Sequence, residues 1–130
     1  MATATTFVLV GHCGADSYSL SHAVSRAVPN AKVIAADDVA SLDAALASPA
    51  VLLVNRVLDG DFKTGNGVEL IASLASKNPR PKMILISNYA DAQASAVAAG
   101  ASPGFGKSQI SSPATVELLR TLASSVSESR

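Results

Sequence analysis

The stretch Val51–Gly60 reads VLLVNRVLDG, and its first half decides how this chain folds. Pro49 breaks the chain just before it, and four apolar residues then follow one another without alternation. A continuous apolar run of this length is typical of a strand buried on both faces of a parallel sheet. The run ends at Asn55, and open α/β sheets bind their ligands outside the carboxyl ends of the strands. Asn55 is therefore the first candidate for a functional side chain.

The composition describes one domain with an ordinary aliphatic core. The chain has 130 residues, of which 48% are apolar and 4% aromatic, so we expect one domain over 1–130. Lys+Arg and Asp+Glu each number 10, which predicts no nucleic-acid partner and no basic membrane-binding face. Met1–Thr6 lacks the features of a signal peptide, and no apolar run is long enough to span a membrane. These features, with a single cysteine, favour a cytoplasmic protein, with a frayed tail at 124–130.

Apolar runs and helical periodicities alternate five times along the chain. The predicted helix starts are capped by Asp16 or Ser17, by Ser41 and by Asp91, and Pro113 opens the last helix after a serine. Alternation with short connections predicts an α/β fold, a flavodoxin-like five-stranded parallel sheet in the order 2-1-3-4-5. Two helices are expected on one face and three on the other. The strands are expected at residues 7–10, 32–35, 51–54, 83–86 and, weakly, 102–105.

Four pieces at the strand ends stand in a recognisable order and spacing. They are VLLVN at 51–55, GVELI at 67–71, ILISNYA at 84–90, and AGAS at 99–102 followed by Lys107. Together they resemble the receiver domain of bacterial two-component response regulators, over nearly the whole chain. The Gly-Ala pair with a lysine six residues after the alanine is the most specific part. The resemblance implies a CheY-like fold and a role in two-component signal transduction.

The resemblance also implies a site at the carboxyl ends of the strands. In the family, a carboxylate pair after the first strand holds Mg²⁺, and an aspartate ending the third strand accepts the phosphoryl group. A hydroxyl residue after the fourth strand and a lysine after the fifth contact that group. The carboxylate pair falls here on Gly11 and His12, and the acceptor falls on Asn55, whereas Ser87 and Lys107 match the family.

These departures remove the chemistry of phosphoryl transfer. An amide is not a useful nucleophile towards a phosphoryl group, and Mg²⁺ prefers carboxylate oxygens that Gly11 and His12 do not provide. We therefore expect a degenerate pseudo-receiver that is not an enzyme and needs no metal and no cofactor. Lys107 is expected either to be solvated at the rim or to donate to the Asn55 amide oxygen. In the second case the pocket would hold water or a small anion. The affinity for an anion would rise as the pH falls through ~6.5, where the imidazole of His12 is expected to gain a proton.

Other functions remain open at this point. The favoured one is a signalling module that binds a kinase or an output protein, or itself, through the last two helices. The alternative is a flavodoxin-like ligand- or cofactor-binding domain that uses the loop Gly11–Gly14 to bind a cofactor phosphate or a corrin. Gly104–Ser108 ends like a phosphate-binding P-loop, but Ala101 occupies the position of that motif's first glycine. Cys13 is expected to be a small buried residue and not a nucleophile.

Overall fold

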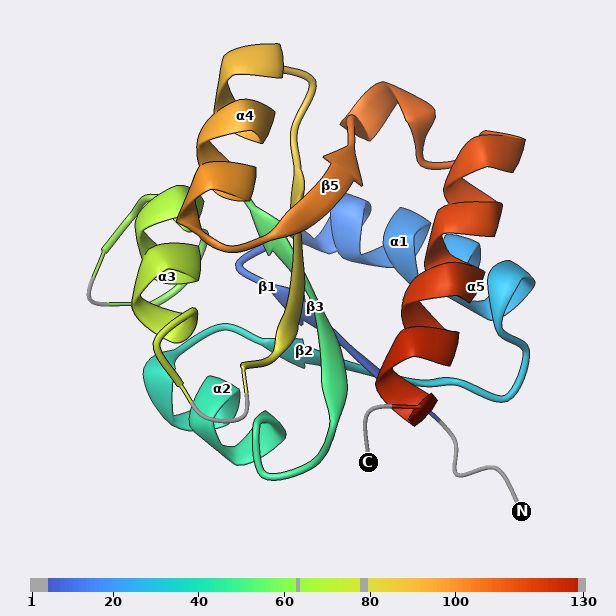
Figure 1. The fold of residues 1–130 in the computed structure, drawn as a ribbon, viewed down its shortest axis with the longest axis horizontal. Helices are drawn as coiled ribbons and strands as arrows, with labels where there is room; N and C mark the ends of the chain where they lie inside the picture. Colours follow the sequence, from blue (N-terminus) through green and yellow to red (C-terminus); the bar gives the residue numbers. More distant parts are fainter. Residues whose placement is uncertain (1–4, 63, 78–79, 129–130) are drawn as a thin grey trace.

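The computed structural model describes residues 5–62, 64–77 and 80–128 and has one parallel β-sheet. The strand order is β2-β1-β3-β4-β5, and every pairing is parallel, as predicted (Figure 1). All six residues of β3 are buried, which agrees with its unbroken apolar sequence. The strands are β1 (Thr6–Val10), β2 (Lys32–Ala36), β3 (Ala50–Asn55), β4 (Lys82–Ile86) and β5 (Ser102–Phe105).

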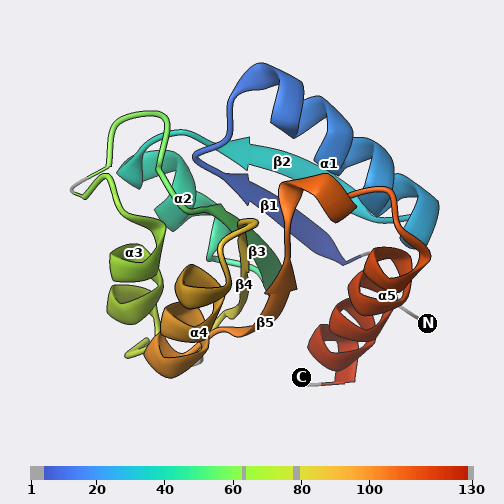
Figure 2. The same ribbon diagram turned by 90° about the horizontal axis from the view of Figure 1, so that it is seen from above.

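Five α-helices cover the sheet in two layers, and each layer encloses its own core. The helices are α1 (Gly14–Ala27), α2 (Val39–Ala45), α3 (Gly67–Leu74), α4 (Ala90–Ala99) and α5 (Pro113–Glu128), with a short 3₁₀ turn η1 (Lys107–Gln109) before α5. Figure 2 shows α1 and α5 on one face and α2, α3 and α4 on the other. Leu20 and Leu119 lie in the first core, and Leu42 and Ile71 in the second. The predicted division into two and three helices is confirmed.

Three of the predicted helix caps were wrong. Helix α1 begins after Cys13, which makes no side-chain cap hydrogen bond, so Asp16 lies in the first turn. Helix α2 is capped by Asp38, whose carboxylate accepts from the Ser41 amide at 2.8 Å, and Ser41 completes the capping box. Asp91 likewise lies inside the first turn of α4. Asp16 and Asp91 therefore still interact favourably with the dipoles of α1 and α4, because both carboxylates lie in a first turn.

The last helix begins where the sequence predicts it and ends later than expected. Helix α5 begins at Pro113, as predicted, and continues through Glu128, so the expected tail is helical over most of its length. Val126 is buried in the α1–α5 core, and residues 129–130 lie outside the described part. Within the described residues, no helix combines the length and apolar character needed to cross a membrane.

Candidate functional site

The loop after β3 folds back over the ends of β1 and β2. The Asp59 amide donates to the Gly11 carbonyl at 2.9 Å, and the Asp61 amide donates to the Asp37 carbonyl at 2.8 Å. Leu58, between these two anchors and Asn55, is buried with 8% of its surface exposed. The carboxyl edge of the sheet is therefore partly covered by the protein's own chain at the position where the receiver resemblance implies a metal site.

Gly11 has no room for a side chain. Its φ is +71°, a backbone conformation that favours glycine. A Cβ atom placed on it would lie 2.7 Å from Leu58 Cδ2 and 3.1 Å from Leu58 Cα. The space that a carboxylate side chain would need at this position is thus filled by Leu58.

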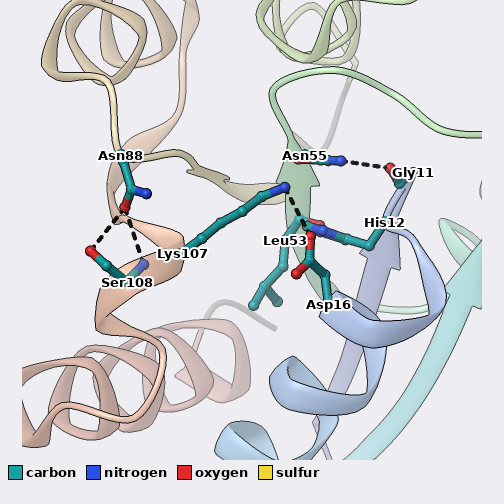
Figure 3. Close-up of polar contacts among 8 residues, drawn as sticks. All are labelled: Gly11, His12, Asp16, Leu53, Asn55, Asn88, Lys107 and Ser108. Carbon is teal, nitrogen blue, oxygen red and sulfur yellow. Dashed lines mark hydrogen bonds and ion pairs between the residues drawn. The ribbon is translucent and has the colours of Figure 1, made fainter.

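Asn55 is held by the same glycine. Its side chain is buried, with 7% of the residue exposed, and its Nδ2 donates to the Gly11 carbonyl at 3.0 Å. Figure 3 shows the amide pointing across from the end of β3 to the end of β1. The Gly11 oxygen accepts both this bond and the one from Asp59, and it has two lone pairs to do so. The amide therefore uses a donor that an aspartate would lack.

His12 is a buried imidazole that is bonded to the backbone. Its Nε2 lies 2.8 Å from the Leu53 carbonyl oxygen, and because a carbonyl only accepts, Nε2 carries the proton. In the neutral form of the ring Nδ1 is therefore an unprotonated acceptor, and it is buried without a partner in the described residues. Burial lowers the pKa of His12 below its ordinary value of 6.5, although the bond to Leu53 acts in the opposite direction. The charge of Lys107 also lowers this pKa, and the charges of Asp16 and Asp37 raise it. The expectation of an imidazole that titrates normally in this pocket was wrong.

Lys107 is paired with Asp16 and not with Asn55. Its Nζ lies 2.9 Å from Asp16 Oδ2, with side-chain exposures of 38% for the lysine and 27% for the aspartate. The hydrogen bond from Lys107 lowers the pKa of Asp16, and a weaker bond from the Cys13 side chain acts in the same direction. Figure 3 shows the lysine extended towards the start of α1. The predicted bond from Lys107 to the Asn55 amide oxygen was wrong, since the Lys107 ammonium is directed to the Asp16 carboxylate.

Ser87 is used to shape the turn into α4. It is 4% exposed, and its Oγ accepts from the Tyr89 amide at 3.1 Å. The next residue, Asn88, accepts with Oδ1 from both the amide and the hydroxyl of Ser108, each at 3.1 Å. The connections after β4 and β5 are thereby tied together, as Figure 3 shows for Asn88 and Ser108.

All five predicted site residues lie at the carboxyl edge of the sheet, and a hydrogen bond joins Asn55 to Gly11. Sequence analysis missed Leu58, which fills the space above Gly11, and the partnership of Asp16 with Lys107. Leu58 carries a weak signal, since an apolar residue inside a polar loop is typical of one that packs inward. Cys13 is exposed and not buried as expected.

No group of three His, Cys, Asp or Glu residues that could hold a metal ion exists within residues 5–62, 64–77 and 80–128. Two aspartates, Asp38 and Asp61, do line an open hollow of about 330 Å³ with Val39, Ala40 and Phe62. The hydrogen bonds from the Ser41 hydroxyl and amide lower the pKa of Asp38, so its carboxylate is already engaged. This hollow lies beside α2, and none of the five predicted site residues lines it.

Comparison with known proteins shows the fold but no sequence family. No family model matches the chain, and no curated protein matches it. Among solved structures, the chain is similar to the signal receiver domain of a DNA-binding response regulator from Colwellia psychrerythraea. The TM-score is 0.72 at 15% identity, and the match covers 94% of this chain and 99% of the other.

Two further solved structures lead to the same result. One is a response regulator from Thermotoga maritima, with a TM-score of 0.68 and 17% identity over 98% of this chain and 100% of the other. The other is the non-phosphorylated receiver domain of the stress response regulator RcsB from Escherichia coli. Its TM-score is 0.71 at 16% identity, over 92% of this chain and 95% of that one. The chain therefore has the flavodoxin-like, CheY-like fold found in response-regulator receiver domains.

Proposed function

We propose that this chain is a receiver-like signalling module that works without being phosphorylated and without catalysing a reaction. The carrying observation is that the Asn55 amide donates to the Gly11 carbonyl while Leu58 covers Gly11. Two of the three positions at which the family resemblance implies carboxylates, Gly11 and Asn55, are thus bonded to each other, and the loop after β3 packs on Gly11. A phosphoryl acceptor needs an anionic or readily ionised oxygen nucleophile, and a metal needs hard oxygen ligands. Gly11 and Asn55 supply neither.

The proposal is tested by phosphorylation from a small donor. The purified chain is incubated with acetyl phosphate and Mg²⁺, and its intact mass is measured. A receiver with a working acceptor, treated in parallel, serves as the positive control. We expect no added phosphoryl group on this chain. A stable adduct that peptide mapping assigns to an aspartate or glutamate would contradict the proposal.

A module of this kind acts by binding a protein, and the exposed surface of α4 is the feature that best supports such binding. Only Ala96 of its residues is buried, and Val97 is 44% exposed. We propose that the surface formed by α4, α5 and the edge strand β5 binds a signalling kinase, an output protein or a second copy of the chain. Val97→Asp should then weaken self-association in sedimentation or capture of a partner from the host. Ala72→Asp on the exposed side of α3 is the matched control.

The alternative of a cofactor-binding module at the loop after β1 has no specific observation in its favour. The Gly11 carbonyl already accepts two internal hydrogen bonds, and Leu58 packs against this glycine. A flavin or a corrinoid would be revealed by visible absorption of the purified protein. A coloured preparation would therefore favour this alternative over the signalling proposal.

A further inference from the structure

The ion pair between Lys107 and Asp16 joins two connections that lie far apart in the sequence. Lys107 opens the η1 turn after β5, and Asp16 lies in the first turn of α1. Their charged atoms are 2.9 Å apart, and each side chain is roughly one third exposed, at 38% and 27%. The pair is therefore in contact with solvent, and other ions can compete for either partner.

This ion pair closes a ring of contacts around the carboxyl edge, which we call the edge ring. Each contact joins a different pair of the four connections that follow β1, β3, β4 and β5. Of the four contacts, only the ion pair joins two opposite full charges. The edge ring consists of Asn55 to Gly11 at 3.0 Å, Lys107 to Asp16 at 2.9 Å, Ser108 to Asn88 at 3.1 Å, and the Arg56 guanidinium 4.6 Å from the centre of the Tyr89 ring.

We propose that Asp16 is an internal, autoinhibitory ligand of Lys107 that keeps small oxyanions such as sulfate and phosphate away from this lysine. The inference concerns the same carboxyl edge of the sheet as the proposed function. It rests on that proposal in one respect, namely that position 55 carries a neutral amide. An external oxyanion must displace the Asp16 carboxylate before it binds Lys107. The carboxylate is part of the chain, so it competes at every concentration of the external ion.

The charges at this edge lead to the same inference. Asp16 neutralises Lys107, and His12 and Asn55 contribute no charge when the imidazole is neutral. The charges of the pair cancel, whereas Lys107 without a partner, as the sequence suggested, would have left a positive charge at this position. Anion binding therefore belongs to the state in which Asp16 has been moved away or replaced, and not to the state with the ion pair formed.

The size of the competition follows from the strength of such pairs. In a partly exposed ion pair, the ratio of the formed to the broken state is about one and a half to five. An external ion binds only to the broken state, so its affinity for Lys107 is about two to six times lower than for a free lysine. Replacement of Asp16 by asparagine should recover this factor. The formal charge rises by one in the same step, so a control of equal charge is needed.

The test is a sulfate titration at pH 8, followed by amide NMR at constant ionic strength. We expect Asp16→Asn to bind sulfate about two to six times more tightly than the unchanged chain, with the largest shifts at residues 14–16 and 107–109. Glu117→Gln removes one carboxylate from the exposed pair with Arg120 and is the control of equal charge. Adding Lys107→Gln to Asp16→Asn should abolish the gain. Asp16→Ser replaces Asp16→Asn if the asparagine variant does not fold.

Three results would overturn the proposal. Equal sulfate affinity for Asp16→Asn and the unchanged chain would show that Asp16 does not compete. An equal gain for Glu117→Gln would show a general effect of charge. A gain that persists in the double variant would assign the binding to the start of α1 and not to Lys107. Repeating the titration with phosphate tests the oxyanion class, and no phosphodonor is present, so failure here leaves the proposed function standing.

Discussion

Asn55 donates to the carbonyl of Gly11 across 3.0 Å, and this bond joins the end of β3 to the end of β1. An aspartate at position 55 would be close in shape but could not donate when ionised. Its oxygens would face the Gly11 carbonyl oxygen, and two acceptors would oppose each other in a buried position. The amide is thus a structural group at this edge.

Asn55→Asp should therefore destabilise the fold by about 1–3 kcal/mol at pH 7, the cost of leaving buried polar groups unpaired. Urea unfolding measures this loss. Asn66→Asp is the matched control because Asn66 caps α3 with its Oδ1, and aspartate caps equally well. Equal stability of Asn55→Asp and the unchanged chain would refute the structural role of the amide. The variant should also remain unlabelled by acetyl phosphate.

His12 should make the stability depend on pH in a defined direction. Burial lowers its pKa in the folded chain below 6.5, so the unfolded chain binds more protons between the two pKa values. The contribution of the neutral imidazole is then fully present above pH 6.5 and is lost as the pH falls towards the folded pKa, by at most about 1.4 kcal/mol per pH unit. Urea unfolding at pH 8, 6 and 5 should show this loss.

His12→Gln is the matched variant for this measurement. Its amide can donate to the Leu53 carbonyl but does not titrate, so the slope between pH 8 and 5 should flatten. Asp16, whose pKa is lowered by its bond from Lys107, loses its contribution only below its ordinary value of 3.8. An unchanged slope in His12→Gln would assign the pH dependence to other groups.

Gly11→Ala should destabilise the fold by about 1–3 kcal/mol, because the new methyl group meets Leu58 and the positive φ is unfavourable for alanine. Adding Leu58→Ala relieves the collision but not the backbone strain, so the two changes together should cost less than their sum. Gly14→Ala is the control, since a Cβ there meets nothing within 4 Å. Strict additivity of the two substitutions would show that Leu58 does not fill this space.

Gln93→Ala should cost about 1–3 kcal/mol, because the Gln93 side chain bridges β4 and β5 where their pairing is irregular. Its Nε2 lies 2.8, 3.1 and 3.2 Å from the carbonyl oxygens of Leu85, Ser87 and Phe105, which share its two protons. Its Oε1 accepts from the Gly104 amide at 3.2 Å. Gln109→Ala in the exposed η1 turn is the control. Hydrogen exchange of the Gly104 amide should accelerate only in Gln93→Ala, and unchanged exchange there would contradict the bridging role.

Much of the fold could be predicted because it depends on signals local to the sequence. The buried strands are unbroken apolar runs, and Pro113 and Gly100 mark a helix start and a helix end by their own backbone preferences. Such preferences act within a few residues of the chain. General rules on handedness and connection length then predicted a parallel sheet covered on both faces, and the strand order was taken from the common flavodoxin-like arrangement.

The contacts at the site could not be predicted in the same way. Asp16 looked like a helix cap because the sequence shows only its neighbours, and Lys107 approaches it only after β5 has joined the sheet. The fold-back of the loop after β3 depends on backbone bonds from Asp59 and Asp61, and such bonds carry no side-chain signature. The positions of Gly11 and Asn55 were predicted from the order of the strands, but not their contact.

The packing of Leu58 on Gly11 has an evolutionary consequence. A carboxylate at position 11 collides with Leu58, and a carboxylate at position 55 loses the bond to the Gly11 carbonyl. Each substitution alone therefore lowers stability without supplying a complete acceptor site. A mutational path towards phosphorylation must first reshape the loop after β3. Selection for stability therefore opposes the return of single carboxylates at positions 11 and 55.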